Sequence, residues 1–422
     1  MKRPEALMES LSTNLNHFLQ RINGGLNKPQ KKFLHDGLIG LLRAGRPIVC
    51  QMARSLPDQD TDFLSRRDRL EAHLNHNKDD FDPKLKAALP VLWVPLIRED
   101  TPLILDLSDL AKPLAKKMDY LATVRDGSTG QLVHGYWLVE LYASVTHKNP
   151  IPILLEPFSH EQPHCPGQNP VILAAVHQVF EWTEGRGVLV VDRGGDALTL
   201  LEDWLDHGYR FVVRLRGDRD VLAFYSQFGG PAQTVEVQQE GRWVPILARD
   251  LAEQVATPYR WSRVVKHKGK VVLRLGQMGW IRVRLPGRSE VLTMVVSRQA
   301  GSDTPMMLLT TLPVETVRDA KRALRYYVRR WECEEGIRLL KAGVNLERIR
   351  TFHWTAICRL VLLCVLVMLY LTWLVERKPA LTERMIAFGQ PLPDEPDFLL
   401  YRLLTGLTAV MMACFYLRRD LL

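Results

Sequence analysis

Hydrophobic positions recur at helical spacing through the first part of the chain, residues 1–88. Asn27 and Pro29 predict the start of one helix, and Gly45 predicts its end. The outer faces of these helices are basic, as in a small DNA-binding domain, although any solvated helical bundle shows the same pattern. We therefore expect an all-helical N-terminal DNA-binding domain, followed by a linker over the acidic residues 79–83.

From residue 89 the pattern changes, because short apolar runs alternate with amphipathic segments. Runs of this kind predict buried strands, and the segments between them predict helices. The predicted strands are Leu103–Asp106, Gln131–Val145, Ile151–Leu155, Gly187–Val191, Phe211–Leu215 and Met306–Thr311. Helices are predicted over Pro170–Thr183 and Asp196–His207, and the alternation indicates an α/β fold.

These patterns divide the chain into five segments. The N-terminal helices are followed by the first part of an α/β core, a β-rich basic insertion, the second part of the core and a C-terminal helical region. After residue 88 the boundaries are 89–220, 221–300, 301–376 and 377–422. In the second part of the core, Pro313 opens a long predicted helix that runs through Lys341.

One apolar run, Leu360–Val375, is 16 residues long and lies between Arg359 and Glu376. A membrane-spanning helix needs about 20 such residues, so we expect a buried core helix and no membrane contact. The cysteine and aromatic residues within the run suit a packed interior.

Composition limits the class of protein. The 422 residues are 46% hydrophobic and 24% charged, as in ordinary globular domains, which argues against a disordered chain or a disulfide scaffold. The six cysteines include no Cys-x2-Cys pair, so we expect reduced thiols in a cytoplasmic protein. Neither a Walker A sequence nor a Gly-x-Ser-x-Gly elbow is present, so ATP use and that hydrolase chemistry are not indicated.

The net charge of +9 is concentrated in the stretch 254–289, which holds nine Lys and Arg residues and no Asp or Glu. Strict alternation over Trp280–Leu285 predicts a strand with its arginines on one face, and Gly276–Gly279 predicts the turn of a hairpin. We expect this basic ribbon to contact nucleic acid, with a solvated sheet edge as the alternative. The side chains expected to contact DNA here are Lys268, Lys270, Arg274, Arg282 and Arg284.

Two carboxylates, Asp106 and Asp192, follow directly on apolar strands. Carboxylates at the ends of central strands of an α/β sheet face the crevice in which ligands bind. Asp192 is also placed to cap the helix that follows it, and a strand-end aspartate is more often a cap than a catalytic group.

The predicted helix through Lys341 carries a third group of candidates. At about 100° per residue, its Tyr327, Arg330, Glu334 and Lys341 fall on one face. A solvated stripe held by an Arg330–Glu334 pair is the structural alternative. Gly336 in the helix interior costs about 1 kcal/mol relative to Ala, which a stripe selected for stability alone would not need.

The pattern Tyr-x2-Arg-x3-Glu-x6-Lys resembles the signature of DDE transposases of bacterial cut-and-paste insertion sequences. Asp192-Arg-Gly is similar to the family's second-aspartate motif, and Leu103–Asp109 is similar to its first, over a resemblance that covers roughly residues 100–345. One departure is Gly195, where the family has an aromatic residue. Asp109 competes with Asp106 for the first role, and we prefer Asp106 because it directly ends the apolar run.

The resemblance implies an RNase H-like catalytic core that binds two Mg²⁺ ions, with Mn²⁺ as a substitute, for DNA end cleavage and strand transfer. The implied catalytic residues and metal ligands are Asp106, Asp192 and Glu334. The implied clamp on the DNA strand consists of Tyr327, Arg330 and Lys341. Inverted-repeat transposon ends and target DNA are the implied partners, bound by a homodimer in a synaptic complex, and the implied location is the cytoplasm, in association with the nucleoid.

Two alternatives remain open at this point. An RNase H-like nuclease would use the same metal ions without strand transfer. A catalytically inactive DNA-binding derivative would keep the basic ribbon and lose the chemistry.

Overall fold

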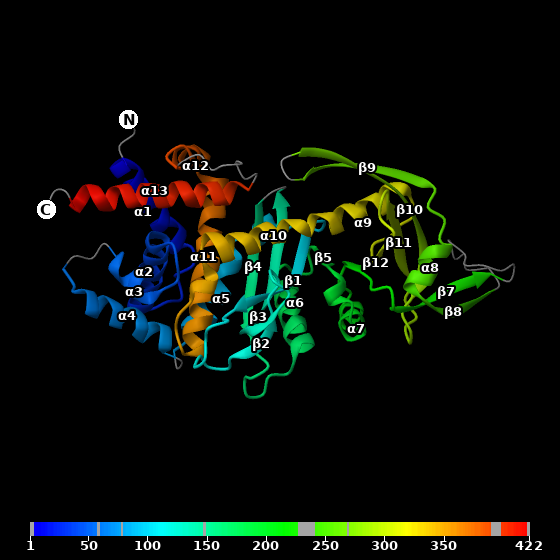
Figure 1. Cartoon of the computed structure of the whole chain (residues 1–422), viewed down its shortest axis with the longest axis horizontal. Coiled ribbons are helices and arrows are strands. Elements are labelled where there is room, and N and C mark those ends of the chain that lie inside the picture. Colours follow the sequence, from blue (N-terminus) through cyan, green and yellow to red (C-terminus); the bar gives the residue numbers. More distant parts are fainter. Residues whose placement is uncertain are drawn as a thin grey trace. The chain divides into compact units, whose positions relative to one another are not determined.

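The computed structural model describes residues 4–56, 60–76, 79–146, 149–226, 241–267, 270–389 and 398–419. The chain forms two compact units that share the strand β1 (Pro102–Ala111). The first unit contains Met1–Ile97, Leu107–Glu184 and Glu332–Leu422, and the second contains Arg98–Asp106 and Gly185–Trp331. The boundaries of these units do not coincide with the boundaries of the five segments expected from the sequence pattern. Together they make a mixed α/β fold, as predicted (Figure 1).

The N-terminal part of the first unit is helical, as the sequence pattern predicts. Its helix α2 (Lys28–Ala44) begins at Asn27, whose side chain accepts the Gln30 N–H while the Gln30 side chain accepts the Asn27 N–H. Gly45 ends it at φ 64°, a left-handed conformation that favours glycine. The other helices of this part are α1 (Pro4–Gln20), α3 (Val49–Arg54), α4 (Phe63–Asn75) and α5 (Phe81–Ala88).

The linker expected over residues 79–83 is not present, because helix α5 begins there. Asp79 and Asp82 bind the guanidinium of Arg359, and Arg359 Nε lies 2.9 Å from Asp82 Oδ2. The Arg359 side chain is 1% exposed. These acidic residues therefore hold a buried cation in the interior of the unit, which local sequence does not reveal.

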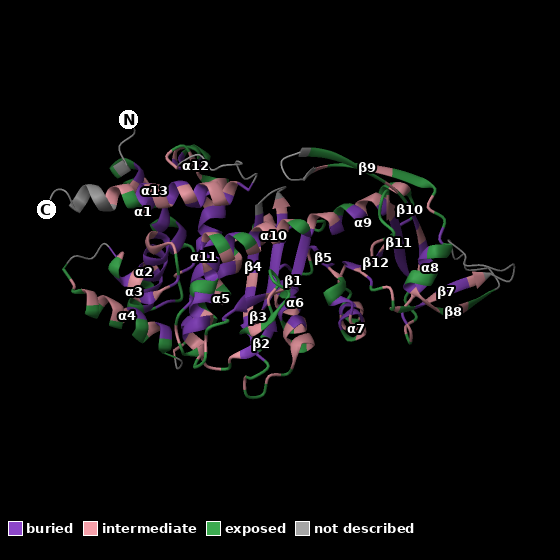
Figure 2. Ribbon diagram, in the orientation of Figure 1, coloured by how far each residue is buried: buried purple, intermediate pink, exposed green. Residues whose placement is uncertain are grey.

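The core of the first unit is the apolar helix α11 (Trp354–Arg377). It is the one helix among the described residues that is long and apolar enough to cross a membrane, and 89% of its most apolar window is buried inside the protein. Figure 2 shows the helix buried along most of its length. It packs against α1, α2, α4, α12 (Pro379–Ile386), α13 (Leu399–Arg419) and the strand β4. The prediction of a buried core helix is confirmed.

Three strands of the first unit form an antiparallel group, with β3 (Leu132–Thr146) between β2 (Ala122–Arg125) and β4 (Asn149–Phe158). The second half of β1 belongs to the same unit, and β3 is its neighbour in the sheet. Helix α6 (Gln168–Trp182) packs against β3 and β4. The predicted strands and helix of this region are confirmed to within a few residues.

In the second unit, the strands follow the order β1-β5-β6-β12-β11-β10-β7-β8. The first half of β1, β5 (Val188–Val191) and β6 (Phe211–Arg214) run parallel. Each is an apolar run that is almost fully buried, as expected for central parallel strands. Helix α7 (Leu198–Asp206) connects β5 to β6. The remaining elements are β7 (Asp220–Ser226), β8 (Gly241–Leu247), α8 (Ala248–Gln254), β11 (Leu292–Gln299) and β12 (Met306–Thr310).

The basic segment forms a ribbon of two antiparallel strands, β9 (Tyr259–His267) and β10 (Lys270–Arg284). The predicted turn at Gly276–Gly279 is wrong, because β10 runs straight through it. A Cβ on Gly276 would lie 2.5 Å from the Arg298 carbonyl oxygen, and one on Gly279 would lie 1.9 Å from the Ala256 carbonyl oxygen. These glycines therefore allow close approach of neighbouring backbone rather than a turn.

The long helix expected from Pro313 through Lys341 is interrupted. Helix α9 (Val317–Arg329) begins at Thr316, whose side chain caps the Asp319 N–H. A second helix, α10 (Trp331–Arg338), follows, and its last turn passes into the π-helical turn Leu339–Gly343. A π-turn changes the rotation per residue, so the single face predicted for this region does not extend to Lys341.

Candidate active site

The strand ends of the second unit bring three charged residues into register. In the parallel strands β1, β5 and β6, Leu105 pairs with Val191 and Val191 pairs with Val213. The next residues along these strands are Asp106, Asp192 and Arg214. Because successive residues of parallel strands stay in register, these three lie side by side where the parallel pairing ends, although β1 itself continues to Ala111. The sequence analysis predicted the two carboxylates and missed Arg214, which local sequence marks only as the polar residue near the end of an apolar run.

Asp192 lies at the turn between β5 and α7 and is partly exposed. Its Oδ1 accepts the backbone N–H of Gly194 at 2.6 Å and so caps the short 3-10 turn Arg193–Gly195. The expected cap on the helix itself is wrong, because α7 begins after Ala197 without a side-chain cap. Within the turn, Gly195 is buried, and a Cβ there would lie 2.2 Å from Val191 Cγ1. The tight turn thus has no room for the aromatic residue expected from the resemblance, and it still presents the Asp192 carboxylate at the strand end.

Asp106 is paired with the guanidinium of Arg330. Arg330 Nη1 lies 3.3 Å from Asp106 Oδ2, and their side chains are 9% and 18% exposed, respectively. The same guanidinium lies 6.0 Å from the ring centroid of Tyr327. Arg214 approaches Tyr327 as well, donating from Nη1 to its hydroxyl at 3.4 Å. The second unit therefore gathers two carboxylates, two guanidinium groups and one tyrosine around the ends of β1, β5 and β6.

Asp109 lies further along β1, in the first unit, in a different environment. Its carboxylate is 3% exposed, and its Oδ1 accepts from Lys341 Nζ at 2.9 Å and from the Gly127 N–H at 3.0 Å. Lys341 Nζ also lies 3.3 Å from Glu347 Oε1. Burial alone would lower the pKa of Lys341, but Asp109 and Glu347 raise it above its ordinary value. The buried ion pair argues against Asp109 as a metal ligand and agrees with the preference for Asp106.

Glu334 lies on α10 in the first unit and is partly exposed. The helix packs closely on β3, where a Cβ on Gly336 would lie 2.7 Å from Tyr142 Cε1. Two residues along β3, the Ser144 hydroxyl donates to the Glu332 carboxylate. The glycine that appears costly in the sequence is thus explained by helix-to-strand contact. Because Asp106 and Asp192 belong to the second unit, a metal site shared with Glu334 stays a prediction.

At one end of the basic ribbon the arginines contact other residues of the protein, and at the other end they are exposed to solvent. Arg282 donates to Thr293 Oγ1 at 2.6 Å and to the Val314 carbonyl at 3.2 Å, and Arg284 lies 4.2 Å over the ring of Trp243. Both alternate with buried apolar residues as predicted, but the contacts of Arg282 bind it within the protein.

Toward the outer end of the ribbon, Arg263 and Arg274 face each other across β9 and β10 and are both exposed. Loss of hydration and the facing Arg274 lower the pKa of Arg263. Like charges directly opposite on two strands repel, and an anion between them relieves that repulsion. Of the other two predicted DNA contacts, Lys270 begins β10 and Lys268 lies outside the described residues.

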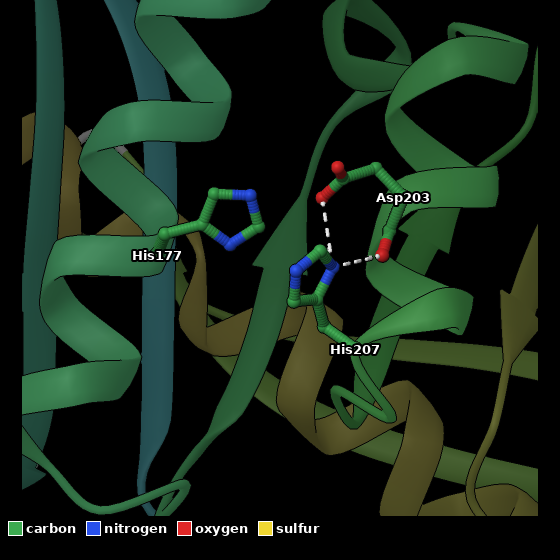
Figure 3. A group of neighbouring side chains, drawn as sticks. All are labelled: His177, Asp203 and His207. Carbon is green, nitrogen blue, oxygen red and sulfur yellow. Dashed lines mark hydrogen bonds and ion pairs between the residues drawn. The ribbon is translucent and has the colours of Figure 1, made fainter.

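A further pair of ionisable residues lies on and just after α7 in the second unit (Figure 3). His207 Nδ1 lies 2.8 Å from the Asp203 carbonyl oxygen and 3.4 Å from Asp203 Oδ1. Both contacts are local to the last turn of the helix, so they stabilise its C-terminal end. Figure 3 also draws His177, which comes from α6 of the first unit.

The donor set at the strand ends fits a hard divalent cation. Asp106 and Asp192 offer carboxylate oxygens, and hard cations such as Mg²⁺ prefer oxygen ligands. Two carboxylates at neighbouring strand ends repel one another, and a bound cation removes that repulsion. The residues present therefore fit a divalent metal ion.

This geometry defines a class of protein: a mixed α/β fold in which adjacent parallel strands carry carboxylates side by side. Residues 166–370 match the family model of the transposase DDE domain. That segment includes Asp192 and Glu334, and Asp106 precedes it. The match supports a DNA transposase.

One solved structure similar to this chain is a cryo-EM structure of the piggyBac transposase synaptic complex with hairpin DNA. The alignment has a TM-score of 0.42 and 13% sequence identity, and it covers 93% of this chain and 75% of that chain. A similarity at this level is too weak to transfer the properties of that protein to this chain.

Proposed function

We propose that this protein is a DDE transposase that cleaves the DNA ends of an insertion sequence and joins them to target DNA. The observation that carries the proposal is the register of Asp106 and Asp192 at the ends of parallel strands, in a chain whose residues 166–370 match the transposase DDE domain. The family generally uses divalent metal ions. An RNase H-like core, two Mg²⁺ ions and Mn²⁺ as a substitute are part of the proposal.

In this proposal Asp106, Asp192 and Glu334 would hold the metal ions. Bound metal ions would activate the attacking oxygen and stabilise the leaving oxygen of a phosphodiester. Arg330 beside Asp106 and Arg214 beside Asp192 supply forked guanidinium donors that match a phosphate group. The Tyr327 ring lies about 6 Å from both guanidinium groups and limits the positions that their side chains adopt. These residues would orient the DNA strand, and no protein nucleophile is required.

The proposed partners are inverted-repeat ends and target DNA, bound by a homodimer because two ends must be brought together. The exposed arginines of the β9–β10 ribbon support contact with a polyanion, since no acidic residue lies between positions 254 and 289. We place the protein in the cytoplasm, in association with the nucleoid, where its DNA substrate would be.

The test is incubation of the protein with labelled end DNA, a target plasmid and Mg²⁺. Cleaved ends and joined products are expected, and both should disappear on addition of EDTA. Asp192→Asn should abolish both products while end binding is retained. The matched control is Asp218→Asn, an exposed aspartate in the same unit whose side chain is 75% exposed, and it should react like the unmodified protein.

The outcomes separate the alternatives. Cleavage without joined product would favour a nuclease without strand transfer. End binding without any cleavage, unchanged by Asp192→Asn or Glu334→Gln, would indicate an inactive DNA-binding derivative. Full activity of Asp192→Asn would contradict the proposal itself.

A further inference from the structure

The surroundings of Lys341 differ from what the resemblance implies. A side chain that clamps DNA needs a cation directed to the substrate. Here the ammonium of Lys341 is 22% exposed and lies 2.9 Å from Asp109 Oδ1 and 3.3 Å from Glu347 Oε1. All three residues belong to the first unit. The charge of Lys341 is therefore already balanced within the protein.

The pair joins elements that are far apart in sequence. Asp109 is in the second half of β1, and Lys341 is in the π-helical turn that continues α10. Asp109 is itself fixed from a second direction by the Gly127 N–H, at 3.0 Å. A buried carboxylate with two donors holds a defined position, so it gives the lysine a rigid anchor.

The neighbouring strand end reinforces the same connection. Lys112, one residue beyond β1, donates from Nζ to the carbonyl oxygens of Glu347 at 2.6 Å and Ile349 at 3.1 Å. The segment that follows the π-turn is thereby attached to the end of β1 by a second lysine, which is buried with 6% exposure. Lys112 and Lys341 thus fasten two successive parts of the segment after α10 to one strand.

Helix α10 is held from its other end by β3. Gly336 packs against the Tyr142 ring, and Glu332 accepts from the Ser144 hydroxyl. Glu334 lies between these two contact residues in sequence. Its position in the first unit is therefore set by β3 contacts at both neighbours and by the Asp109–Lys341 pair one to two turns further along the chain.

We propose that Asp109 is a positioning residue that acts through Lys341, and that their buried ion pair fixes the helix carrying Glu334. Lys341 serves as an internal tether rather than as a contact to DNA. The inference rests on the proposed function, because it assigns the consequence of the tether to a metal ligand on that helix. Loss of the tether would let Glu334 leave its position and weaken metal binding without removing any DNA contact.

The experiment compares Asp109→Asn and Lys341→Met with a matched variant, Asp82→Asn. Asp109→Asn leaves Lys341 with Glu347, and Asp82→Asn leaves Arg359 with Asp79, so each removes one carboxylate from a buried cation of the same unit. Three quantities are measured, the binding and cleavage assays at a temperature below the melting point of every variant. They are the thermal shift on titration with MgCl₂ alone, the affinity for end DNA in EDTA, and the Mg²⁺ dependence of cleavage.

Asp109→Asn and Lys341→Met should each raise the Mg²⁺ concentration at half-maximal thermal shift and cleavage by about tenfold, as outer-shell changes do at metal sites. The double variant should lose no more than either single variant, because both remove one interaction. End-DNA affinity in EDTA should change less than about twofold. Lys341→Arg keeps the ion pair and should restore most of the Mg²⁺ response.

Other results would overturn the inference. If Lys341→Met weakens end binding in EDTA while Asp109→Asn does not, Lys341 contacts DNA. If Asp109→Asn lowers the melting temperature but keeps the Mg²⁺ response, as Asp82→Asn should, its role is structural only. Asp192→Asn is measured in the same assays. Normal cleavage by this variant would contradict the proposed function. If Asp192→Asn is inactive while Asp109→Asn keeps a normal Mg²⁺ response, only the tether is contradicted. If Asp109→Asn does not fold, Lys341→Met gives the same distinctions.

Discussion

Asp106 and Asp109 stand three residues apart on β1, one in each compact unit. Asp106 keeps 18% of its side-chain exposure and faces a guanidinium at 3.3 Å, beside a neighbouring strand end that carries Asp192. The Asp109 side chain is 3% exposed, and its carboxylate accepts from the Lys341 ammonium at 2.9 Å and from the Gly127 backbone N–H at 3.0 Å. The two carboxylates are chemically alike, so their surroundings decide what each can do.

The difference shows that one strand can carry both a carboxylate available to bind a cation and a carboxylate that stabilises the fold. A partly exposed carboxylate at the end of a parallel pair can exchange partners with a cation from solution. A buried carboxylate with fixed donors exchanges less readily, because leaving them would give up a short ion pair and a backbone hydrogen bond. The sequence analysis preferred Asp106 to Asp109 as the first metal ligand, and the two environments agree with that preference.

The largest expected effect tests this comparison directly. Asp106→Asn should lower the cleavage rate by about a thousandfold, or about 4 kcal/mol of activation free energy, because it removes a proposed metal ligand. Asp109→Asn should retain measurable cleavage at high Mg²⁺ concentration. Single-turnover cleavage of end DNA measures both variants. Equal loss in the two, or a greater loss in Asp109→Asn, would reverse the roles assigned to the two halves of β1.

A second prediction concerns the buried end of β1 and its dependence on pH. Burial lowers the pKa of Lys112 from 10.5 to about 8, although the charge of Glu347 opposes that shift. Between these values the unfolded chain binds a proton that the folded chain has released, so the free energy of unfolding rises with pH. Below pH 8 the cost of the buried charge is fully present. The expected gain from pH 7.5 to pH 10.5 is roughly 3 kcal/mol, from 1.36 kcal/mol for each pKa unit.

Urea denaturation at the two pH values measures this gain, and comparison with Lys112→Met isolates the Lys112 contribution. The variant should lose most of the pH-dependent gain. Lys84→Met, which removes an exposed lysine paired with Asp80, should keep it. An identical pH dependence in Lys112→Met and the unmodified protein would show that Lys112 keeps its proton throughout.

The parts of the site that could be predicted from the sequence are those set by local pattern. Apolar runs that end in Asp106 and Asp192 predict central strands, and burial on both faces requires such runs, so both strands were located correctly, although β1 continues past Asp106 to Ala111. The capped helix from Asn27 to Gly45 was also predictable, since its start and stop signals are local. Pattern alone could not show which strands are neighbours, which is why Arg214 was missed.

The errors share a physical cause, because they concern contacts between distant segments. Glycine permits both a turn and close backbone approach, and only the neighbours of Gly276 and Gly279 show that the second applies. The helical face predicted to include Lys341 assumed unbroken α-geometry, which ends at the π-turn. The partner of Lys341 lies 232 residues away in sequence, so the pair is invisible to periodicity.

A third prediction examines the packing beneath the Glu334 helix. Gly336→Ala places a methyl group 2.7 Å from Tyr142 Cε1, inside van der Waals contact. Overpacking outweighs the gain in helix propensity, so the variant should lose about 1–2 kcal/mol of unfolding free energy, measured by urea denaturation. Gly24→Ala is the control, because nothing lies within 4 Å of the added carbon, and its effect should stay within about 0.5 kcal/mol. Unchanged stability in Gly336→Ala would mean that β3 does not fix α10.

The smallest expected effect concerns Arg214, which shares the environment of Asp106 rather than that of Asp109. Its position beside Asp192 and its contact with the Tyr327 hydroxyl place a guanidinium at the strand ends. If it binds one phosphate, Arg214→Ala should weaken end binding by roughly tenfold and reduce the slope of log affinity against log salt by about 0.9.

Filter binding over a series of NaCl concentrations measures that slope, with Arg318→Ala as the control on an exposed arginine of the same unit. The control should leave the slope unchanged, since α9 carries Arg318 on its exposed side. A slope unaffected by Arg214→Ala, together with a lower melting temperature, would assign Arg214 to support of Tyr327. The substrate would then contact Asp106 of β1 together with Asp192 and Arg330 from neighbouring elements, and the two halves of β1 would differ in the surroundings of their carboxylates alone.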